Sequence, residues 1–332
     1  MPRLLAAPDK FRGTLTGAQA AEAMSRAAHS AGWHVVAKPI SDGGEGLLDC
    51  FGGPNRHTRV AGPLGAPVDA GWRLDGSLAV IEMAAASGIA LVTAGNDPVA
   101  ATTRGTGELI RAAIDAGAET VIVGAGGSAT TDGGWGAVEQ LRELSPLDGS
   151  RGVRVVVATD VRTRFVDAAA VFAPQKGADA DQVAALTARL TLLADGYEHD
   201  FGVSVRNLDG SGAAGGLAGG LAALGATIRP GFALVADALH LADDVRAADL
   251  VVTGEGRLDA TSLAGKATGS LVTLCAGLGV PVVVIAGQVA DGLARSLRTV
   301  DLARRFGAIR AWDEAARCLE TAVLDELDRK TG

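Results

Sequence analysis

Aromatic residues and positive charge are both scarce in this chain of 332 residues. Phe, Tyr and Trp together make up 4% of the sequence, and 38 acidic residues outnumber 30 Lys and Arg, for a formal net charge of −8. The chain has no long basic run and no Lys or Arg interleaved with aromatic residues, so we expect neither nucleic acid nor a membrane surface as a partner. With so few aromatic residues, the core must consist mainly of Ala, Val, Leu and Ile, which is typical of α/β proteins.

Cysteine is also sparse, and the usual nucleotide-binding fingerprints are missing. Cys50, Cys275 and Cys318 are scattered and form no CxxC pair, which excludes a disulfide framework or a zinc site and fits a reducing cytoplasm. The apolar stretch before Pro8 is too short for a signal peptide or a membrane span. The P-loop pattern GxxxxGK[ST] does not occur, which argues against a Walker-type ATPase, and no GxGxxG follows the first expected strand, which argues against a standard Rossmann protein.

The length and the order of expected elements predict an α/β fold with two domains. A single hydrophobic core stops growing near about 250–300 residues, which this chain exceeds. Two expected strands near the N-terminus and three near the C-terminus would form a flavodoxin-like parallel sheet in the order 2-1-3-4-5. These strands are expected at residues 3–7, 34–40, 250–253, 280–286 and 308–312.

The middle of the chain has a different sequence pattern. Between residues 56 and 83, Gly-Pro and Asp-Gly turn signals separate short alternating runs, which indicates antiparallel hairpins. We therefore predict a flavodoxin-like domain of residues 1–54 plus 240–332, interrupted by a mixed α/β domain of residues 55–239. We expect the active site in the cleft between the two domains, and a monomer or a homodimer.

Charged residues follow the expected strands of the first domain at the end where parallel sheets bind ligands. Acidic residues with neighbouring glycines come after strands one, two and three, and basic residues accompany two of them. A sheet needs turns at these points but does not need charges of both signs. The residues concerned are Asp9, Lys10, Arg12, Asp42, Gly43, Gly44, Glu45, Glu255, Arg257, Asp259 and, slightly later, Lys266.

The inserted domain contributes a glycine-rich loop between an expected strand and a helix. Successive backbone N–H groups in such a loop can wrap an anion, although a plain turn is an equally good explanation of this sequence alone. The residues that would bind are Gly126, Gly127, Ser128 and Thr130.

Three further features of this domain allow both a functional and a structural interpretation. Asp160 ends the next strand, where it could accept a proton from a substrate hydroxyl or cap a helix. Lys176 lies in an expected turn, where it could be a cation that binds a ligand or an ordinary solvated side chain. The glycines Gly212, Gly215 and Gly216 fit either an anion-binding nest or close packing, and we favour the nest.

Phosphoryl transfer is the chemistry that uses such a set of groups. It needs cations and amides around the phosphates, carboxylates for Mg²⁺, and an acid near the attacking hydroxyl. We therefore assign Glu45, Glu255 and Asp259 to the metal. The catalytic candidates are Asp42, Asp160, Lys10 and Lys266.

Eight segments in one order resemble the type-1 glycerate kinase family. They are APDKFRGTLT, SDGGEG, EMAAASGI, DPVAATTRGTGELI, GGSATTDGG, VFAPQKGA, GAAGGLAGG and TGEGRLDATSLAGK, at residues 7–16, 41–46, 82–89, 97–110, 126–134, 171–178, 212–220 and 253–266. The resemblance implies ATP, Mg²⁺ and glycerate as reactants, with 2-phosphoglycerate as the usual product and 3-phosphoglycerate as the product of some members. It also implies that the two domains hold the substrates between them.

The chain departs from the family pattern in two places. Residues 141–153 are much shorter than the corresponding family segment, which predicts a trimmed edge of the inserted domain. After Asp160, the family tends to have an Asn-Pro, whereas this chain has Arg162 and Arg164. If that Asn binds glycerate, substrate choice has shifted toward another small hydroxy acid.

Two other functions remain open at the level of sequence. A nucleotide-cofactor oxidoreductase would use a similar sheet, but the absence of GxGxxG after the first strand argues against it. A non-catalytic metabolite sensor would bind the ligand without turnover. An ATP- and Mg²⁺-dependent glycerate kinase accounts best for the whole set of motifs.

Overall fold

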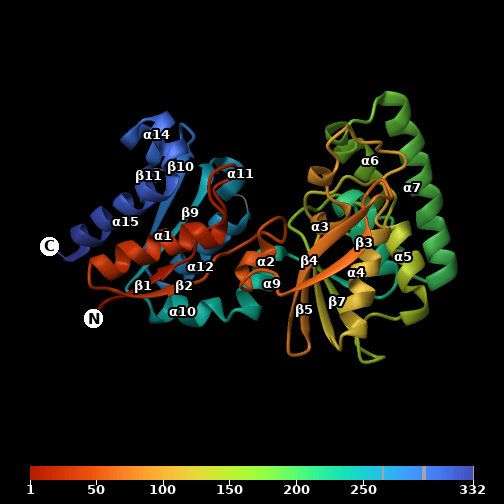
Figure 1. The fold of residues 1–332 in the computed structure, drawn as a ribbon, viewed down its shortest axis with the longest axis horizontal. Coiled ribbons are helices and arrows are strands. Elements are labelled where there is room, and N and C mark those ends of the chain that lie inside the picture. Colours follow the sequence, from red (N-terminus) through yellow and green to blue (C-terminus); the bar gives the residue numbers. More distant parts are fainter. Residues whose placement is uncertain (264, 294–296, 332) are drawn as a thin grey trace. The chain divides into compact units, whose positions relative to one another are not determined.

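The computed structural model describes residues 1–263, 265–293 and 297–331 (Figure 1). The chain forms two compact units, one of residues 1–42 and 232–332 and the other of residues 43–231. The first unit is built on a parallel sheet and the second on a mixed sheet, as the predicted α/β class requires. Across the described residues, no helix combines the length and the apolar character that crossing a bilayer requires.

The sheet of the first unit has the predicted flavodoxin-like order. Its five strands run β2-β1-β9-β10-β11, and every neighbouring pair is parallel. They are β1 (Arg3–Ala6), β2 (His34–Ala37), β9 (Leu250–Leu258), β10 (Val282–Val289) and β11 (Thr299–Asp301).

The prediction of the fifth strand was wrong in position. Residues 308–312 belong to helix α14 (Ala308–Asp313), and the edge strand is the three-residue segment β11. Asp301 ends that strand and caps α13 (Leu302–Phe306) by accepting a hydrogen bond from the Arg304 N–H at 2.8 Å. Gly307, with φ 88°, then separates α13 from α14, so the local cap and turn outweigh the strand-like alternation of residues 308–312.

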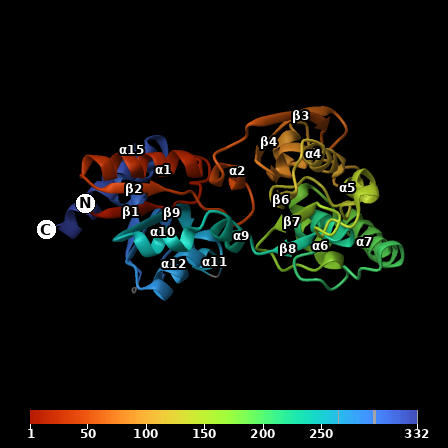
Figure 2. The same cartoon turned by 90° about the horizontal axis from the view of Figure 1, so that it is seen from below.

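Helices cover both faces of this sheet. Figure 2 shows α1 (Gly17–Ser30) and α15 (Ala315–Thr331) on one face, and α10 (Leu241–Ala247) and α12 (Ala267–Leu278) on the other. The strands alternate accordingly, since Leu4 packs in the cluster with α1 and Leu5 in the cluster with α12. Thr16 caps α1 in a reciprocal pair with Gln19, which fixes where this helix begins.

Two short helices follow β8 and lead into β9. The chain forms α9 (Gly231–Ala238) and then α10, because His240 adopts a left-handed conformation with φ 52°. The remaining helix of the unit is α11 (Ala260–Leu263), directly after β9.

The second unit has a six-stranded mixed sheet in the order β3-β4-β5-β6-β7-β8. Its first three strands form the predicted antiparallel meander, and β5 to β8 are parallel. The strands are β3 (Arg56–Ala61), β4 (Pro67–Asp75), β5 (Leu78–Glu82), β6 (Thr120–Gly124), β7 (Arg154–Ala158) and β8 (Thr227–Arg229). The helices are α2 (Leu47–Cys50), α3 (Ala84–Ser87), α4 (Arg104–Asp115), α5 (Trp135–Leu141), α6 (Ala168–Phe172), α7 (Ala180–Phe201) and α8 (Leu217–Ala223).

One apolar cluster holds the second unit together. It joins inward-facing residues of the parallel strands, such as Val123 and Val157, to Leu190 and Tyr197 on α7. The parallel strands end near one edge of this core, where the glycine-rich loop after β6 begins.

Candidate active site

In the first unit, sheet-like hydrogen bonding continues beyond the end of β1 and places Asp9 beside β9. The Asp9 N–H donates to Gly254 O at 2.9 Å, and the Ile40 N–H on the other side donates to Pro8 O at 2.9 Å. The buried Thr253 hydroxyl adds a bond of 2.7 Å to Ala7 O. Three strand ends therefore meet at Asp9, where ligands bind in open parallel sheets.

Asp9, Asp42 and Glu255 form a cluster of negative charge at this edge. Burial, together with the nearby charges of Asp42 and Glu255, raises the pKa of Asp9 from 3.8 to about 7, while Lys10 acts in the opposite direction. The Lys10 N–H donates to Asp9 Oδ1 at 2.7 Å. Carboxylates concentrated in a poorly solvated place favour a bound cation.

The segment after β9 holds the other acidic candidates. The Ser262 hydroxyl donates to Glu255 Oε2 at 3.0 Å, and burial is the main cause that raises the pKa of Glu255. Asp259 instead begins α11: its Oδ1 accepts from the Thr261 N–H at 2.9 Å and hydroxyl at 2.6 Å, which lowers its pKa. Lys266 is exposed at the start of α12.

Among the described residues, no group of three or more His, Cys, Asp or Glu is arranged as a preformed metal site. Mg²⁺ at a kinase site needs no such group, because one or two carboxylates and the phosphates of the nucleotide supply its protein and substrate ligands. The carboxylates of Asp42 and Glu255 lie close enough to Asp9 to raise its pKa in addition to the main effect of burial, so the acidic cluster fits a cation that arrives with a nucleotide.

In the second unit, residues 43–46 pack on the ends of the parallel strands. A Cβ added at Gly43 would lie 2.8 Å from the Ala158 carbonyl, and one at Gly126 would lie 2.6 Å from Gly44 Cα. Glu82, at the end of β5, fixes this loop by accepting from the Gly46 N–H at 2.9 Å. Sequence reasoning did not assign Glu82 to the site, although it begins the motif EMAAASGI.

The glycine-rich loop after β6 is held by Lys176. This side chain is buried, with 5% of its surface exposed, and its Nζ donates to Ser128 Oγ at 2.7 Å and to Thr130 O at 2.6 Å. Burial lowers the Lys176 pKa to about 8, with the charge of Asp132 acting in the opposite direction. Lys176 is therefore an internal cation of the loop and does not lie in a solvated turn.

Asp132 anchors the far end of the same loop. Its Oδ2 accepts from the Thr103 N–H and hydroxyl, both at 2.8 Å, and its Oδ1 accepts from the Gly134 N–H at 3.1 Å. Asn96 braces the loop from another side, with Nδ2 donating to Ala129 O at 2.9 Å and to Lys176 O at 3.0 Å. The sequence analysis identified no role for Asn96, whose partners are far away along the chain.

Residues 212–216 pack directly against this loop. Ala214, Gly215 and Gly216 all have positive φ. A Cβ added at Gly215 would lie 2.0 Å from Thr130 O, and one at Gly212 would lie 2.4 Å from Arg164 O. These contacts are those of close packing, the structural interpretation that the sequence left open.

Asp160 and the two unusual arginines follow β7. Asp160 Oδ1 accepts from the Gly231 N–H at 2.8 Å, which ties the strand end to the start of α9. Both arginines are exposed, and Arg164 forms an ion pair with Asp167 at 2.8 Å.

The candidates thus separate into two sets. The first unit contains Asp9, Lys10, Arg12, Asp42, Glu255, Arg257, Asp259 and Lys266; the second contains Gly43, Gly44, Glu45, Gly126, Gly127, Ser128, Thr130, Asp160, Lys176, Gly212, Gly215 and Gly216. Within each set, the residues gather near the carboxyl ends of parallel strands. The three predicted metal ligands divide between the sets, since Glu45 belongs to the second unit.

Comparisons with known proteins agree on one family. A model of the glycerate kinase family matches residues 4–145 and 142–325. The chain is 40% identical over 325 residues to a glycerate kinase of Bacillus subtilis (86% of this chain, 85% of the relative). It is 36% identical over 327 residues to glycerate 2-kinase of Escherichia coli (87% of this chain, 86% of the relative).

A solved structure agrees with the sequence relatives. A crystal structure assigned to glycerate kinase 2 of Salmonella typhimurium LT2 superposes with a TM-score of 0.84 and 33% identity, over 99% of this chain and 98% of that one. Fold, motifs and relatives therefore agree that this chain is an enzyme of the kinase class and belongs to the glycerate kinase family.

Proposed function

We propose that this enzyme transfers the γ-phosphoryl group of ATP, bound as its Mg²⁺ complex, to the 2-hydroxyl of D-glycerate. The observation that carries the proposal is the acidic cluster of Asp9, Asp42 and Glu255 at the carboxyl end of a parallel sheet. The name of the Escherichia coli relative, glycerate 2-kinase, supports the choice of hydroxyl. The product is then 2-phosphoglycerate.

The proposed roles in the first unit concern the nucleotide and the metal. Mg²⁺ would neutralise charge on the phosphoryl group during transfer. We propose Glu255 and Asp259 as its ligands, Asp259 through the oxygen that does not cap α11. Lys10 and Lys266 would stabilise negative charge on the transferring group. Both are long cations, and Lys10 lies near Asp9 while Lys266 lies near Glu255.

The proposed roles in the second unit concern positioning and proton transfer. The loop after β6 would present backbone N–H groups to an anion, with Ser128 and Lys176 fixing its shape. Asp160 would orient the glycerate hydroxyl and accept its proton, because a carboxylate in hydrogen-bond reach of the attacking oxygen serves as a general base. Asp42 would share that orienting role.

Glycerate-dependent release of ADP tests the proposed function. We expect the purified enzyme to release ADP from Mg·ATP when D-glycerate is added, and to lose this activity when EDTA removes the metal. Parallel assays with L-glycerate, lactate and glycolate measure the substrate choice that Arg162 affects. Turnover with one of these acids but none with D-glycerate would overturn the proposed substrate while leaving a kinase, and no turnover with any acid would overturn the proposed function.

A further inference from the structure

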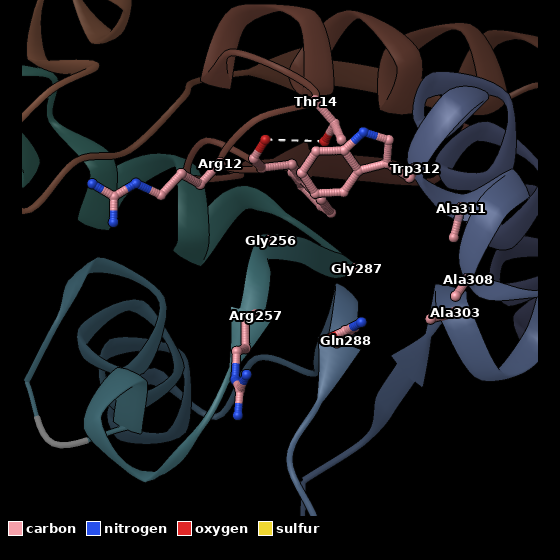
Figure 3. A pocket seen from close by; sticks show the side chains of 11 residues that line it. Arg12, Thr14, Gly256, Arg257, Gly287, Gln288, Ala303, Ala308, Ala311 and Trp312 are labelled. Carbon is pink, nitrogen blue, oxygen red and sulfur yellow. Dashed lines mark hydrogen bonds between the residues drawn. The ribbon is translucent and has the colours of Figure 1, made fainter. Parts of the chain in front are cut away.

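A pocket of about 200 Å³ lies in the first unit at the carboxyl ends of β9 and β10. One wall is the loop after β1, from Phe11 to Thr14, and another is formed by α13 and α14 (Figure 3). None of the motifs in the sequence analysis includes the residues of α13 and α14. The pocket therefore joins two candidate residues of the sequence analysis, Arg12 and Arg257, to a wall that the sequence analysis did not identify.

The pocket has an aromatic side chain that is large, exposed and held in place. Trp312, on α14, has 60% of its surface exposed although the chain contains few aromatic residues. A Cβ added at Gly13 would lie 2.7 Å from Cη2 of the indole, and Gly13 has φ 86°. The loop after β1 thus approaches the ring closely at Gly13. An indole that is fixed yet exposed offers a stacking surface to an aromatic ligand.

The rest of the lining is flat on one side and polar on the other. Alanines from α13 and α14, at 303, 308 and 311, form the apolar side next to Trp312 (Figure 3). The strand ends carry glycines because side chains do not fit there: a Cβ at Gly287 would lie 2.5 Å from Gly256 O. The resulting shape suits a planar group.

Polar groups line the strand side of the same pocket. Arg257 and Gln288 are partners in register on neighbouring strands, and both are exposed. In the described part of the chain, neither Arg257 nor Arg12 has a side-chain hydrogen bond or an ion pair, whereas Arg304 and Arg305 on α13 both form ion pairs. Two guanidinium groups without acidic partners favour an anionic ligand.

We propose that this pocket binds the nucleoside part of the ATP substrate, an inference that rests on the proposed kinase function. The base stacks on Trp312, the Gln288 amide hydrogen-bonds the base edge, and Arg12 and Arg257 attract the phosphates. Glycerate is a poor fit, because it has no flat face for the indole and no apolar part for the alanine wall. The position agrees with the general placement of nucleotides beyond the carboxyl ends of parallel strands.

Steady-state kinetics of Trp312→Ala distinguish a role of Trp312 in nucleotide binding from a purely structural role. Loss of a stacked base should raise the KM for ATP by about tenfold while the KM for D-glycerate stays unchanged, and Trp312→Phe should restore most of the affinity. Ile309→Ala is the matched control, since Ile309 is on the same helix, is 80% exposed and does not line the pocket. Arg257→Ala is the second variant and should also raise the KM for ATP selectively.

A binding measurement without turnover complements the kinetics. ADP alone should quench the fluorescence of the wild-type enzyme and of Ile309→Ala, but not that of Trp312→Phe. An unchanged KM for ATP in both Trp312→Ala and Arg257→Ala, in an enzyme that phosphorylates glycerate normally, would overturn the pocket assignment and leave the kinase function intact. Quenching of Trp312 by ADP in a protein that phosphorylates no hydroxy acid would support the pocket and overturn the function.

Discussion

The ammonium group of Lys176 donates a hydrogen bond of 2.7 Å to the hydroxyl of Ser128, 48 residues earlier in the chain. A second bond, to Thr130 O, holds the same loop. Because the lysine is buried, these acceptors replace water as the solvation of its charge. The glycine-rich loop thus has a shape that depends on one side chain from a distant turn.

Lys176→Met tests that dependence. The substitution keeps the apolar stem but leaves two buried oxygen atoms without their donor, which costs roughly 1–3 kcal/mol for each acceptor. We expect the free energy of unfolding, measured in urea, to fall by about 2–6 kcal/mol, and kcat to fall with it. Lys330→Met is the control: this exposed side chain at the end of α15 donates only to the exposed Asp249 O, so its loss should cost much less stability and leave kcat unchanged. Equal stability of the two variants would contradict the role of Lys176.

Gly126→Ala tests the close approach between the loop after β6 and residues 43–46. The new Cβ would lie 2.6 Å from Gly44 Cα, a distance that the backbone can relieve only by moving. We expect a loss of roughly 1–3 kcal/mol in unfolding free energy, as for other overpacked sites.

The control for this substitution is Gly196→Ala. Gly196 is inside α7, and a Cβ added there meets no atom within 4 Å. Alanine should therefore stabilise the helix by about 0.5–1 kcal/mol. If both glycine substitutions shifted stability in the same direction, the packing of the loop against residue 44 would not be the cause.

The raised pKa of Asp9 predicts a pH dependence of stability. The folded protein keeps the Asp9 proton up to about pH 7, whereas the unfolded chain releases it near 3.8. Between these values the folded state binds more protons, so this group makes the unfolding free energy fall as pH rises, and its effect is complete above about pH 7.

Asp9→Asn removes this titration and keeps an oxygen for the Lys10 N–H. The wild-type protein should therefore lose stability relative to Asp9→Asn between pH 4.5 and pH 7.5, measured by urea unfolding at both values. Asp313→Asn, which neutralises an exposed carboxylate, should parallel the wild type. A constant difference between wild type and Asp9→Asn at both pH values would show that Asp9 ionises normally.

The proposed catalytic residues predict losses in turnover without losses in folding. Asp42→Asn, Asp160→Asn, Lys10→Ala and Lys266→Ala should each lower kcat, by about 100-fold or more for a general base or an electrostatic group. Circular dichroism and melting temperature check that the variants fold. Wild-type turnover in all four would show that the catalytic assignment is wrong.

The sequence predicted the first unit well because its pattern is local. Short apolar runs separated by helical segments led to the order 2-1-3-4-5, which the structure confirms. The fifth strand was misplaced because β11 is only three residues long and alternation alone favoured residues 308–312. The conformation of Gly307, which starts a helix there, cannot be read from its identity alone.

The site was predictable only where chemistry is visible in the sequence itself. Acids and glycines after strands identified Asp9, Glu255 and the loop after β6 as candidates. Trp312 gave no such signal, because it lies far along the chain from the loop against which its ring packs. The roles of Glu82 and Asn96 likewise depend on partners distant in sequence.

The position of the transferred phosphoryl group is the most direct test of the account. The enzyme is incubated with Mg·ATP and D-glycerate, the product is separated, and enolase alone is added while phosphoenolpyruvate formation is followed. We predict immediate conversion, because enolase dehydrates 2-phosphoglycerate and does not act on 3-phosphoglycerate. ADP release without conversion until phosphoglycerate mutase is added would contradict transfer to the 2-hydroxyl.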